Sequence, residues 1–319
     1  MSPAPLTRRR LLRTAFCSSV ALGLNLKTPA SAAPPAAADA LHLLAIGDFG
    51  TTGKLQHAVA GAMRDFLQQH RVPLEALLLL GDNFYGPVEG GFTVDSPRWR
   101  TTFEDVYQER VFDCPCHAVL GNHDYNDNRG GEEVQLAYAR RGGTRWRMPA
   151  KWYRLDLGGE PARLTILALD SNLGTGAEAA AQRKWLAAAL AGPRAPLTMV
   201  VAHHPLYSNG SHGDTASLVE EWGPLFEEHG VHAYLCGHDH DLQHLELEGL
   251  RTSFVLSGGG GARTRKLRST DRTTPFGRDV YGFTHIQVLP DRLVFAHHGQ
   301  QAELLHRFEK RADGSVTIG

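Results

Sequence analysis

Apolar runs alternate with polar segments along the chain, and five of these runs end in short polar motifs. Each run has the length of a buried strand, and several of the segments between them have the spacing of amphipathic helices. The runs are Leu43–Ile46, Leu77–Leu80, Ala118–Leu120, Met199–Val201 and Ala233–Leu235. The pattern predicts strands at these positions, a hairpin over 152–170, and helices over 54–70, 99–108, 178–190 and 215–229.

The character of the chain changes after residue 241. Five apolar segments follow without helices between them, at 243–247, 252–257, 282–288, 292–297 and 304–309. They predict a second, mostly antiparallel sheet. Alternating strands and helices followed by strands alone favour an α/β fold with two sheets packed face to face and helices outside. We expect a single domain over 41–310 and a C-terminal tail over 311–319.

The first 32 residues have the composition of a targeting segment. Arg8-Arg9-Arg10 precedes an apolar stretch over 15–26, and Ala30-Ser31-Ala32 provides a small-residue cleavage site. These features predict a twin-arginine-type export signal over 1–32, read by the twin-arginine export machinery. An Ala/Pro-rich linker over 33–40 follows. Because the apolar stretch is too short for a stable membrane anchor, we expect a periplasmic or secreted protein.

Composition and charge narrow the classes of function. The chain has 319 residues, 42% of them hydrophobic and 21% charged, which is typical of a globular protein. Removal of the signal leaves 28 basic and 34 acidic residues, a net charge of −6. This balance gives no sign of nucleic-acid binding. Three cysteines remain outside the signal, and this odd number excludes a complete disulfide framework.

The five polar motifs carry side chains that bind metals. They are Asp48–Gly50, Gly81–Tyr85, Gly121–Asp124, His203–His204 and Gly237–His240. They follow successive strands, and the carboxyl ends of strands are where α/β proteins bind ligands. Asp82 could bridge two cations, and the spacing of His238 and His240 places both on one side of an extended segment. Each motif alone also fits a turn, a helix cap or a strand end. Together they predict a two-metal hydrolytic site, which can clamp both oxygens of an in-line displacement at phosphorus.

In this combination the motifs resemble those of the calcineurin-like metallophosphoesterase superfamily. Within it the chain resembles the purple acid phosphatases, in particular the small type related to tartrate-resistant acid phosphatase. The resemblance is strongest over 81–85, 121–124 and 234–240, and it extends from about Leu41 to Glu309. It implies a four-layer α/β/β/α sandwich of two packed mixed sheets flanked by helices.

Two positions separate the chain from most of the superfamily. Gly50 stands where most members have a histidine, and Tyr85 follows the bridging aspartate by three residues. A phenolate is a hard anionic ligand that favours Fe(III). The resemblance implies that Fe(III) is bound by Asp48, Asp82, Tyr85 and His240. It also implies that a second, divalent metal (Fe, Zn or Mn) is bound by Asp82, Asn122, His203 and His238.

Further residues gain roles from the same resemblance. His123 and His212 would hold the substrate phosphate and protonate the leaving alkoxide, and Asp124 would orient His123 through a hydrogen bond. An exposed histidine without a role is the alternative for His212. No role is assigned to His204, which stands where the family often has tyrosine. The basic segment 262–278 could steer anionic substrates or be a solvated loop.

The expected function is that of an exported acid phosphatase. It would hydrolyse small phosphate monoesters by in-line attack of a metal-bound hydroxide. Two alternatives stay open at this point. One is a phosphodiesterase or nucleotide pyrophosphatase on the same scaffold, and the other is a redox protein whose di-iron pair reacts with peroxide.

Overall fold

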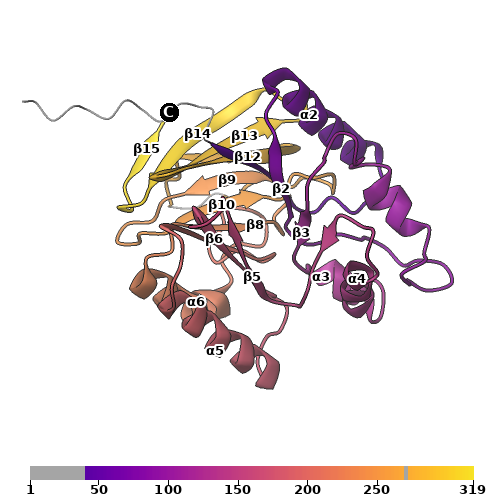
Figure 1. Ribbon diagram of the computed structural model, residues 1–319, viewed down its shortest axis with the longest axis horizontal. Helices are drawn as coiled ribbons and strands as arrows, with labels where there is room; N and C mark the ends of the chain where they lie inside the picture. Colours follow the sequence, from indigo (N-terminus) through magenta and orange to yellow (C-terminus); the bar gives the residue numbers. More distant parts are fainter. Residues whose placement is uncertain (1–39, 269–271) are drawn as a thin grey trace, which may run out of the picture. The chain divides into compact units, whose positions relative to one another are not determined.

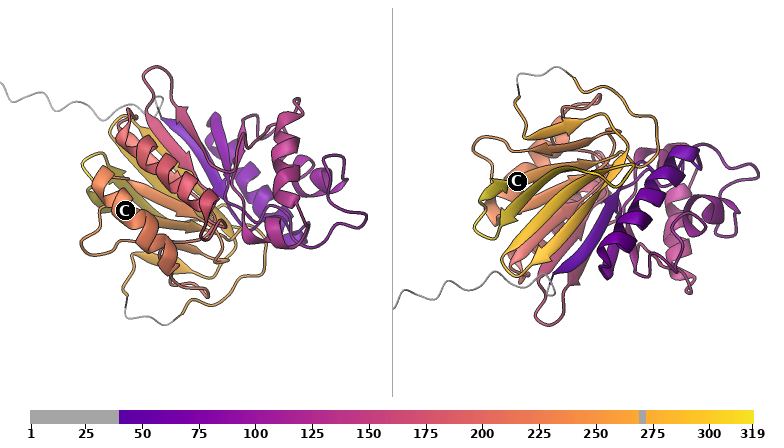
Figure 2. Two further views of the ribbon diagram at one scale, coloured as in Figure 1. Left: turned by 90° about the horizontal axis from the view of Figure 1, so that it is seen from below. Right: turned by 90° about the horizontal axis from the view of Figure 1, so that it is seen from above.

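The computed structural model describes residues 40–268 and 272–319. Within these residues the strands form two mixed sheets, with helices on their outer faces (Figures 1 and 2). The predicted α/β fold with two packed mixed sheets flanked by helices is confirmed. The export signal expected over 1–32, and all but the last residue of the expected linker, lie outside the described residues.

The first sheet combines three parallel strand pairs with an antiparallel half. β1 pairs with β2, β2 with β3 and β3 with β4 in parallel, whereas β12 to β15 run antiparallel to their neighbours. Its strands, in spatial order, are β15 (Val316–Ile318), β14 (Leu304–Arg311), β13 (Arg292–Gly299), β12 (Gly282–Leu289), β1 (Leu41–Ile46), β2 (Leu74–Leu79), β3 (Cys116–Ala118) and β4 (Trp146–Arg147).

The second sheet is also mixed. β6, β7, β8 and β10 are parallel neighbours, and antiparallel strands flank them on both sides. Its strands, in spatial order, are β11 (Phe276–Arg278), β9 (Leu242–Leu245), β10 (Ser253–Ser257), β8 (Ala233–Cys236), β7 (Leu197–Val201), β6 (Leu164–Ala168) and β5 (Tyr153–Leu157). The antiparallel pair β5 and β6 is the hairpin expected over 152–170.

Helices bury apolar faces against the two sheets. α2 packs Val59, Met63 and Phe66 into the core formed with the first sheet. α5 and α6 contribute Leu186 and Trp222 to a separate core against the second sheet. The helices are α2 (Lys54–His70), α3 (Asn122–Asn126), α4 (Gly131–Arg140), α5 (Ala177–Ala191) and α6 (Ala216–His229), with a short π-helix (Arg100–Glu104) where a helix over 99–108 was expected.

The strands after residue 241 do not form one sheet of their own. β12, β13 and β14 extend the first sheet, whereas β9, β10 and β11 join the second. The expectation of a separate antiparallel sheet is therefore wrong. Residues 311–319, expected as a tail, include the end of β14 and the strand β15. Among the described residues, we find no helix with the length and apolar character needed to cross a membrane.

Candidate metal centre

The predicted ligands lie where parallel strands of the two sheets end. Asp48, Asp82 and Asn122 follow β1, β2 and β3 of the first sheet. His203 and His238 follow β7 and β8 of the second sheet. The structure thus assembles the site from strand ends of both sheets. Both sheets must therefore be in place before the donor groups meet.

Three of these ligand residues adopt a left-handed backbone conformation. Asp48, Asp82 and His238 have φ of 58°, 51° and 71°. Residues other than glycine rarely adopt positive φ, and such positions concentrate at functional sites because the surrounding structure must hold them there. The turns change the direction of the chain directly after the strands. A hydrogen bond of 2.8 Å from the His238 amide to Asp48 Oδ2 joins the turn after β8 in the second sheet to the turn after β1 in the first.

One group of donors is rich in oxygen. Tyr85 Oη lies 2.9 Å from Asp82 Oδ2, 3.2 Å from Asp48 Oδ1 and 3.2 Å from His240 Nε2. Asp48 Oδ1 and His240 Nε2 are 3.5 Å apart. The four residues predicted to hold the first metal are thus brought together around a single point.

The second group of donors is rich in nitrogen. Asn122 Oδ1 lies 3.0 Å from His238 Nδ1 and 3.2 Å from His203 Nε2. Asp82 Oδ1 is 3.4 Å from His203 Nε2. Asp82 therefore directs one carboxylate oxygen to each group, an arrangement that allows it to bridge two cations.

Two of the imidazoles are held in the orientation that a metal ligand requires. His203 Nδ1 lies 2.8 Å from the carbonyl oxygen of Leu80, and His240 Nδ1 lies 2.8 Å from that of Arg263. A carbonyl only accepts, so each Nδ1 carries a proton, and Nε2 is the ring nitrogen left to bind a cation. The donor set fits a pair of cations, with carboxylate and phenolate oxygens suited to hard ions and imidazoles to borderline ones.

The electrostatics of the protein groups also favour a cation here. Burial and the neighbouring Asp48 and Asp82 carboxylates raise the pKa of Tyr85 well above its ordinary value. A phenolate at this position therefore needs a strongly positive ion beside it. Burial opposes the charged form of His203, but the two carboxylates outweigh it and raise its pKa to about 10.

Gly50 and Tyr85, the two positions that depart from the superfamily pattern, are linked by packing. A Cβ atom on Gly50 would lie 2.1 Å from the carbonyl oxygen of Asn83. The backbone leading to Tyr85 therefore occupies the space that a side chain at position 50 would need. The Tyr85 amide donates to the Gly50 carbonyl at 3.0 Å, and Arg98 donates to the carbonyls of both residues.

His123 lies beside the oxygen-rich donors. Its backbone amide donates to Asp82 Oδ1 at 2.9 Å, and its ring centroid is 4.3 Å from that of Tyr85. The ring nitrogen Nδ1 lies 2.9 Å from Asp127 Oδ2. Asp127 was not predicted, although its position four residues after His123 at the end of a helix is a usable signal.

Asp124 does not orient His123, in contrast to the sequence prediction. Its buried carboxylate accepts hydrogen bonds from the backbone amides of Asn83 and Gly121 and from the Gln135 side chain. Burial and the nearby Asp82 raise its pKa to about 7. Asp124 instead fastens the turn after β2 to the start of α3, and the His123 ring contacts Asp127.

His212 lies beside the nitrogen-rich donors. Its ring centroid is 4.1 Å from that of His238, and its Nδ1 lies 2.8 Å from Asp239 Oδ1. Arg265, from the basic segment, places Nη1 3.1 Å from His212 Nε2. The structure thus brings His212 to the site. Asp239 was not singled out from the sequence, although it stands between the ligands His238 and His240.

His204 is a further polar residue at the edge of the centre. Its ring centroid is 4.3 Å from that of His238, and its Nδ1 lies 2.8 Å from Ser171 Oγ. Burial and the charge of His203 lower its pKa to about 3, so it is neutral. Its ring nitrogens lie close enough to those of His203 and His238 to belong to the same cluster of possible ligands.

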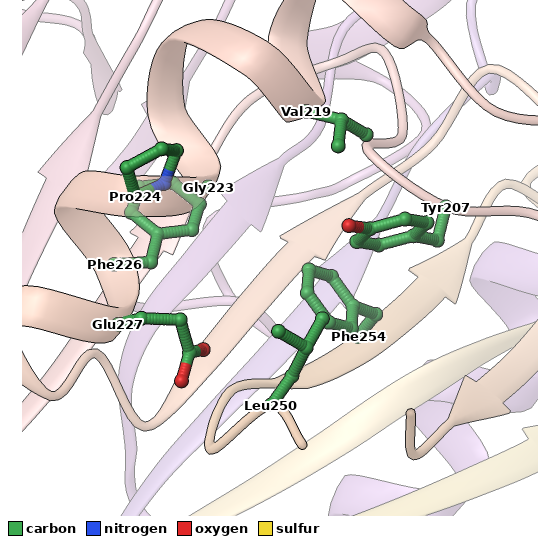
Figure 3. Close-up of a pocket in the computed structure, with 8 residues that line it drawn as sticks. All are labelled: Tyr207, Val219, Gly223, Pro224, Phe226, Glu227, Leu250 and Phe254. Carbon is green, nitrogen blue, oxygen red and sulfur yellow. The ribbon is translucent and has the colours of Figure 1, made fainter. Parts of the chain in front are cut away.

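An apolar recess elsewhere offers no comparable chemistry. It has a volume of about 280 Å³ beside α6 and β10, and side chains such as Tyr207, Pro224 and Phe254 line it (Figure 3). The recess contains the carboxylate of Glu227, but this group already accepts hydrogen bonds from the amides of Arg251 and Thr252. The strand-end donors therefore remain the candidate site.

The fold and this donor set agree with the comparison to known families. Residues 41–242 match the calcineurin-like phosphoesterase family, and the chain belongs to that family and, within it, to the purple acid phosphatases. It is 31% identical over 302 residues to tartrate-resistant acid phosphatase type 5 of Rattus norvegicus, covering 84% of this chain and 90% of the relative.

Solved structures show the same fold at lower identity. Purple acid phosphatase from yellow lupin seeds matches with a TM-score of 0.68 and 16% identity, over 85% of this chain and 53% of that one. GAP50, described as the anchor in the inner membrane complex of Plasmodium, matches with a TM-score of 0.74 and 22% identity, over 84% and 87%. These likenesses concern the fold, so the function has to be argued from the site.

Proposed function

We propose that the protein is an exported acid phosphatase that hydrolyses small phosphate monoesters at a dinuclear metal centre. The observation that carries the proposal is the position of Asp82, whose two carboxylate oxygens face the two donor groups separately. Relatives named tartrate-resistant acid phosphatase, about 30% identical over most of the chain, support the reaction class.

The chemistry divides between the cations and the residues around them. Two cations at such a centre, when bound, lower the pKa of a water and neutralise charge on the phosphoryl oxygens. His123 lies beside the oxygen-rich donors and His212 beside the nitrogen-rich donors. From these positions their rings can hydrogen-bond a phosphate from two directions. A protonated ring nitrogen on either residue can transfer its proton to the leaving alkoxide.

The proposed metals are Fe(III) at the oxygen-rich group and a divalent Fe, Zn or Mn ion at the nitrogen-rich group. Support for Fe(III) comes from Tyr85, whose phenol oxygen lies beside two carboxylates and would provide a further hard oxygen ligand. The second group contains two imidazoles and one amide oxygen beside the shared carboxylate, a set that suits borderline divalent ions.

The proposed location is the periplasm or the exterior of the cell. It rests on the twin-arginine-type segment and the Ala-Ser-Ala site in the first 32 residues. Because this route exports folded proteins, the metals could be inserted before export and leave the cytoplasm with the protein. The expected partners are the export machinery and small phosphorylated substrates.

Substrate preference tests the reaction. The metal-loaded protein should hydrolyse 4-nitrophenyl phosphate faster than bis(4-nitrophenyl) phosphate. Asp82→Ala and Asn122→Ala should each abolish hydrolysis, whereas Asp95→Ala, on an exposed loop, should not change it. A diester preference of about tenfold or more in kcat/KM would favour the phosphodiesterase alternative. Intact hydrolysis in Asp82→Ala would refute the two-metal mechanism.

Colour and metal content test the metals. A tyrosinate bound to Fe(III) should give the purified protein a purple or pink colour, together with iron by elemental analysis. A colourless, active protein that contains only zinc or manganese would remove the proposed role of Tyr85. Peroxide-dependent oxidation without phosphatase activity would instead favour the redox alternative.

A further inference from the structure

Asp127 contacts a residue of the site, although it belongs to none of the sequence motifs and is not a predicted metal donor. Its Oδ2 atom lies 2.9 Å from Nδ1 of His123 and also accepts a hydrogen bond from the backbone amide of Gly86. Gly86 directly follows Tyr85. One carboxylate oxygen thus contacts the histidine beside the site and the segment that carries the phenol.

The end of α3 sets this geometry. Asp127 is the residue after the helix, and its own amide donates to the carbonyl of His123 at 3.1 Å. A spacing of four residues places both side chains on one side of the helix. The two side chains are partly exposed, 34% for His123 and 21% for Asp127. Both side chains are therefore accessible to solvent.

We propose that Asp127 is a positioning residue for the reaction and fixes the ring of His123. An ionised carboxylate only accepts hydrogen bonds, so Nδ1 of the His123 ring carries a proton that it donates to Asp127. This leaves Nε2 as the nitrogen that meets the substrate, in a fixed ring orientation. The inference rests on the proposed function, in which His123 contacts the phosphate.

A purely structural role for Asp127 is the alternative, and the neighbouring residue separates the two. Asn128 joins the same segments, because its Oδ1 accepts from the Val88 amide at 2.8 Å and its Nδ2 donates to the Gly86 carbonyl at 3.1 Å. Asn128 makes these bonds without contacting His123. Asn128→Ala is therefore a matched control that weakens the junction but keeps the histidine contact.

A double-mutant cycle on the metal-loaded, full-length protein tests the inference. His123→Ala should lower kcat/KM for 4-nitrophenyl phosphate by about 10²- to 10⁴-fold. Asp127→Ala should lower it by about 10- to 100-fold. The double variant should be no slower than His123→Ala, because Asp127 acts only through that ring. Asn128→Ala should stay close to the unmodified protein, and all variants should keep their metal content.

The outcomes separate this inference from the proposed function. If the double variant loses the further factor seen for Asp127→Ala alone, the two residues act independently and the positioning role is wrong. Undiminished hydrolysis in His123→Ala would instead refute the proposed role of that histidine. Asp127→Asn keeps the shape of the side chain and carries the same cycle if the alanine variant fails to fold.

Discussion

At the scale of single residues, we expect Tyr85 to determine which metal the oxygen-rich donors select. Its phenol oxygen is within 3.2 Å of three other predicted ligands, and its neighbours are two carboxylates. A phenylalanine there would keep the ring and remove one anionic donor. The negative charge of the ligands around a trivalent ion would fall, whereas the nitrogen-rich group of donors would be unchanged.

We therefore predict that Tyr85→Phe loses the visible absorption band and about one equivalent of iron, and that hydrolysis falls by about tenfold or more. Absorption spectroscopy and elemental analysis measure both effects. Tyr207→Phe is the control, because Tyr207 lines the apolar recess instead of the centre. A coloured Tyr85→Phe protein with full iron content would contradict the assignment.

At the scale of elements, the turns after β1 and β2 pack directly against each other. The closest contact is at Gly50, whose missing side chain makes room for the carbonyl of Asn83. Even a methyl group would have to push the two turns apart. The turns carry Asp48, Asp82 and Tyr85, so a change in their packing is transmitted to the donors.

Gly50→Ala should accordingly destabilise the protein by about 1–3 kcal/mol or more and reduce metal content. Chemical denaturation and elemental analysis provide the measurements. Gly53→Ala is a matched control nearby, because a Cβ atom there meets only Thr51 Oγ1 at 3.4 Å. Equal effects of the two substitutions would show that the turn contact is not limiting.

The sequence predicted the local elements better than their assembly. The motifs after the strands predicted seven metal donors, since each motif is a local pattern, and the structure brings these side chains close together. The placement of β12 beside β1 was missed because it depends on pairs such as Leu44 and His285, which are far apart in the chain. Both sheets bury strands on two faces, so hydrophobicity could not assign a strand to either.

The prediction of the partner of His123 was limited in the same way, because it also depends on the three-dimensional arrangement. Asp124 and Asp127 both follow His123 closely, and the sequence favoured the nearer one. The structure gives the role to Asp127 because Asp124 is turned toward the amides of the neighbouring turn. The choice depends on side-chain direction at the start of a short helix, which spacing alone does not determine.

At the scale of the whole molecule, the donors connect the two sheets. Asp48, Asp82, Tyr85 and Asn122 come from the first sheet, and the three histidine ligands come from the second. Bound metals would therefore stabilise the packed state, and removing them should lower the Tm. Calorimetry before and after chelation should show the loss, and addition of iron and zinc should restore it. An unchanged Tm would mean that metals do not join the sheets.

Two histidines remote from the centre, the half-buried His117 and the buried His297, predict how stability depends on pH. Burial and Arg147 lower the pKa of His117 to about 4, and burial and His306 lower that of His297 to about 3. In the unfolded chain these residues bind protons near pH 6.5, so below that pH the unfolded state binds more protons than the folded state. These groups therefore destabilise the protein as the pH falls from about 6.5 toward 4.

The free energy of unfolding at several pH values measures this effect. Each such histidine should contribute a slope of up to about 1.4 kcal/mol per pH unit. His117→Phe removes one of these groups and should make the dependence shallower by that amount. A slope that is unchanged in His117→Phe would mean that His117 is charged in the folded protein or already shielded in the unfolded one.

The division of the donors between the two sheets has a consequence for how the enzyme matures. A nascent chain in which only one sheet has formed offers either four residues with oxygen donors or three imidazoles, and neither half alone holds the complete donor set. Tight cofactor uptake must then follow the docking of the sheets. The stoichiometry of bound metal would thus serve as a quality check that reports the fraction of correctly assembled molecules in a preparation.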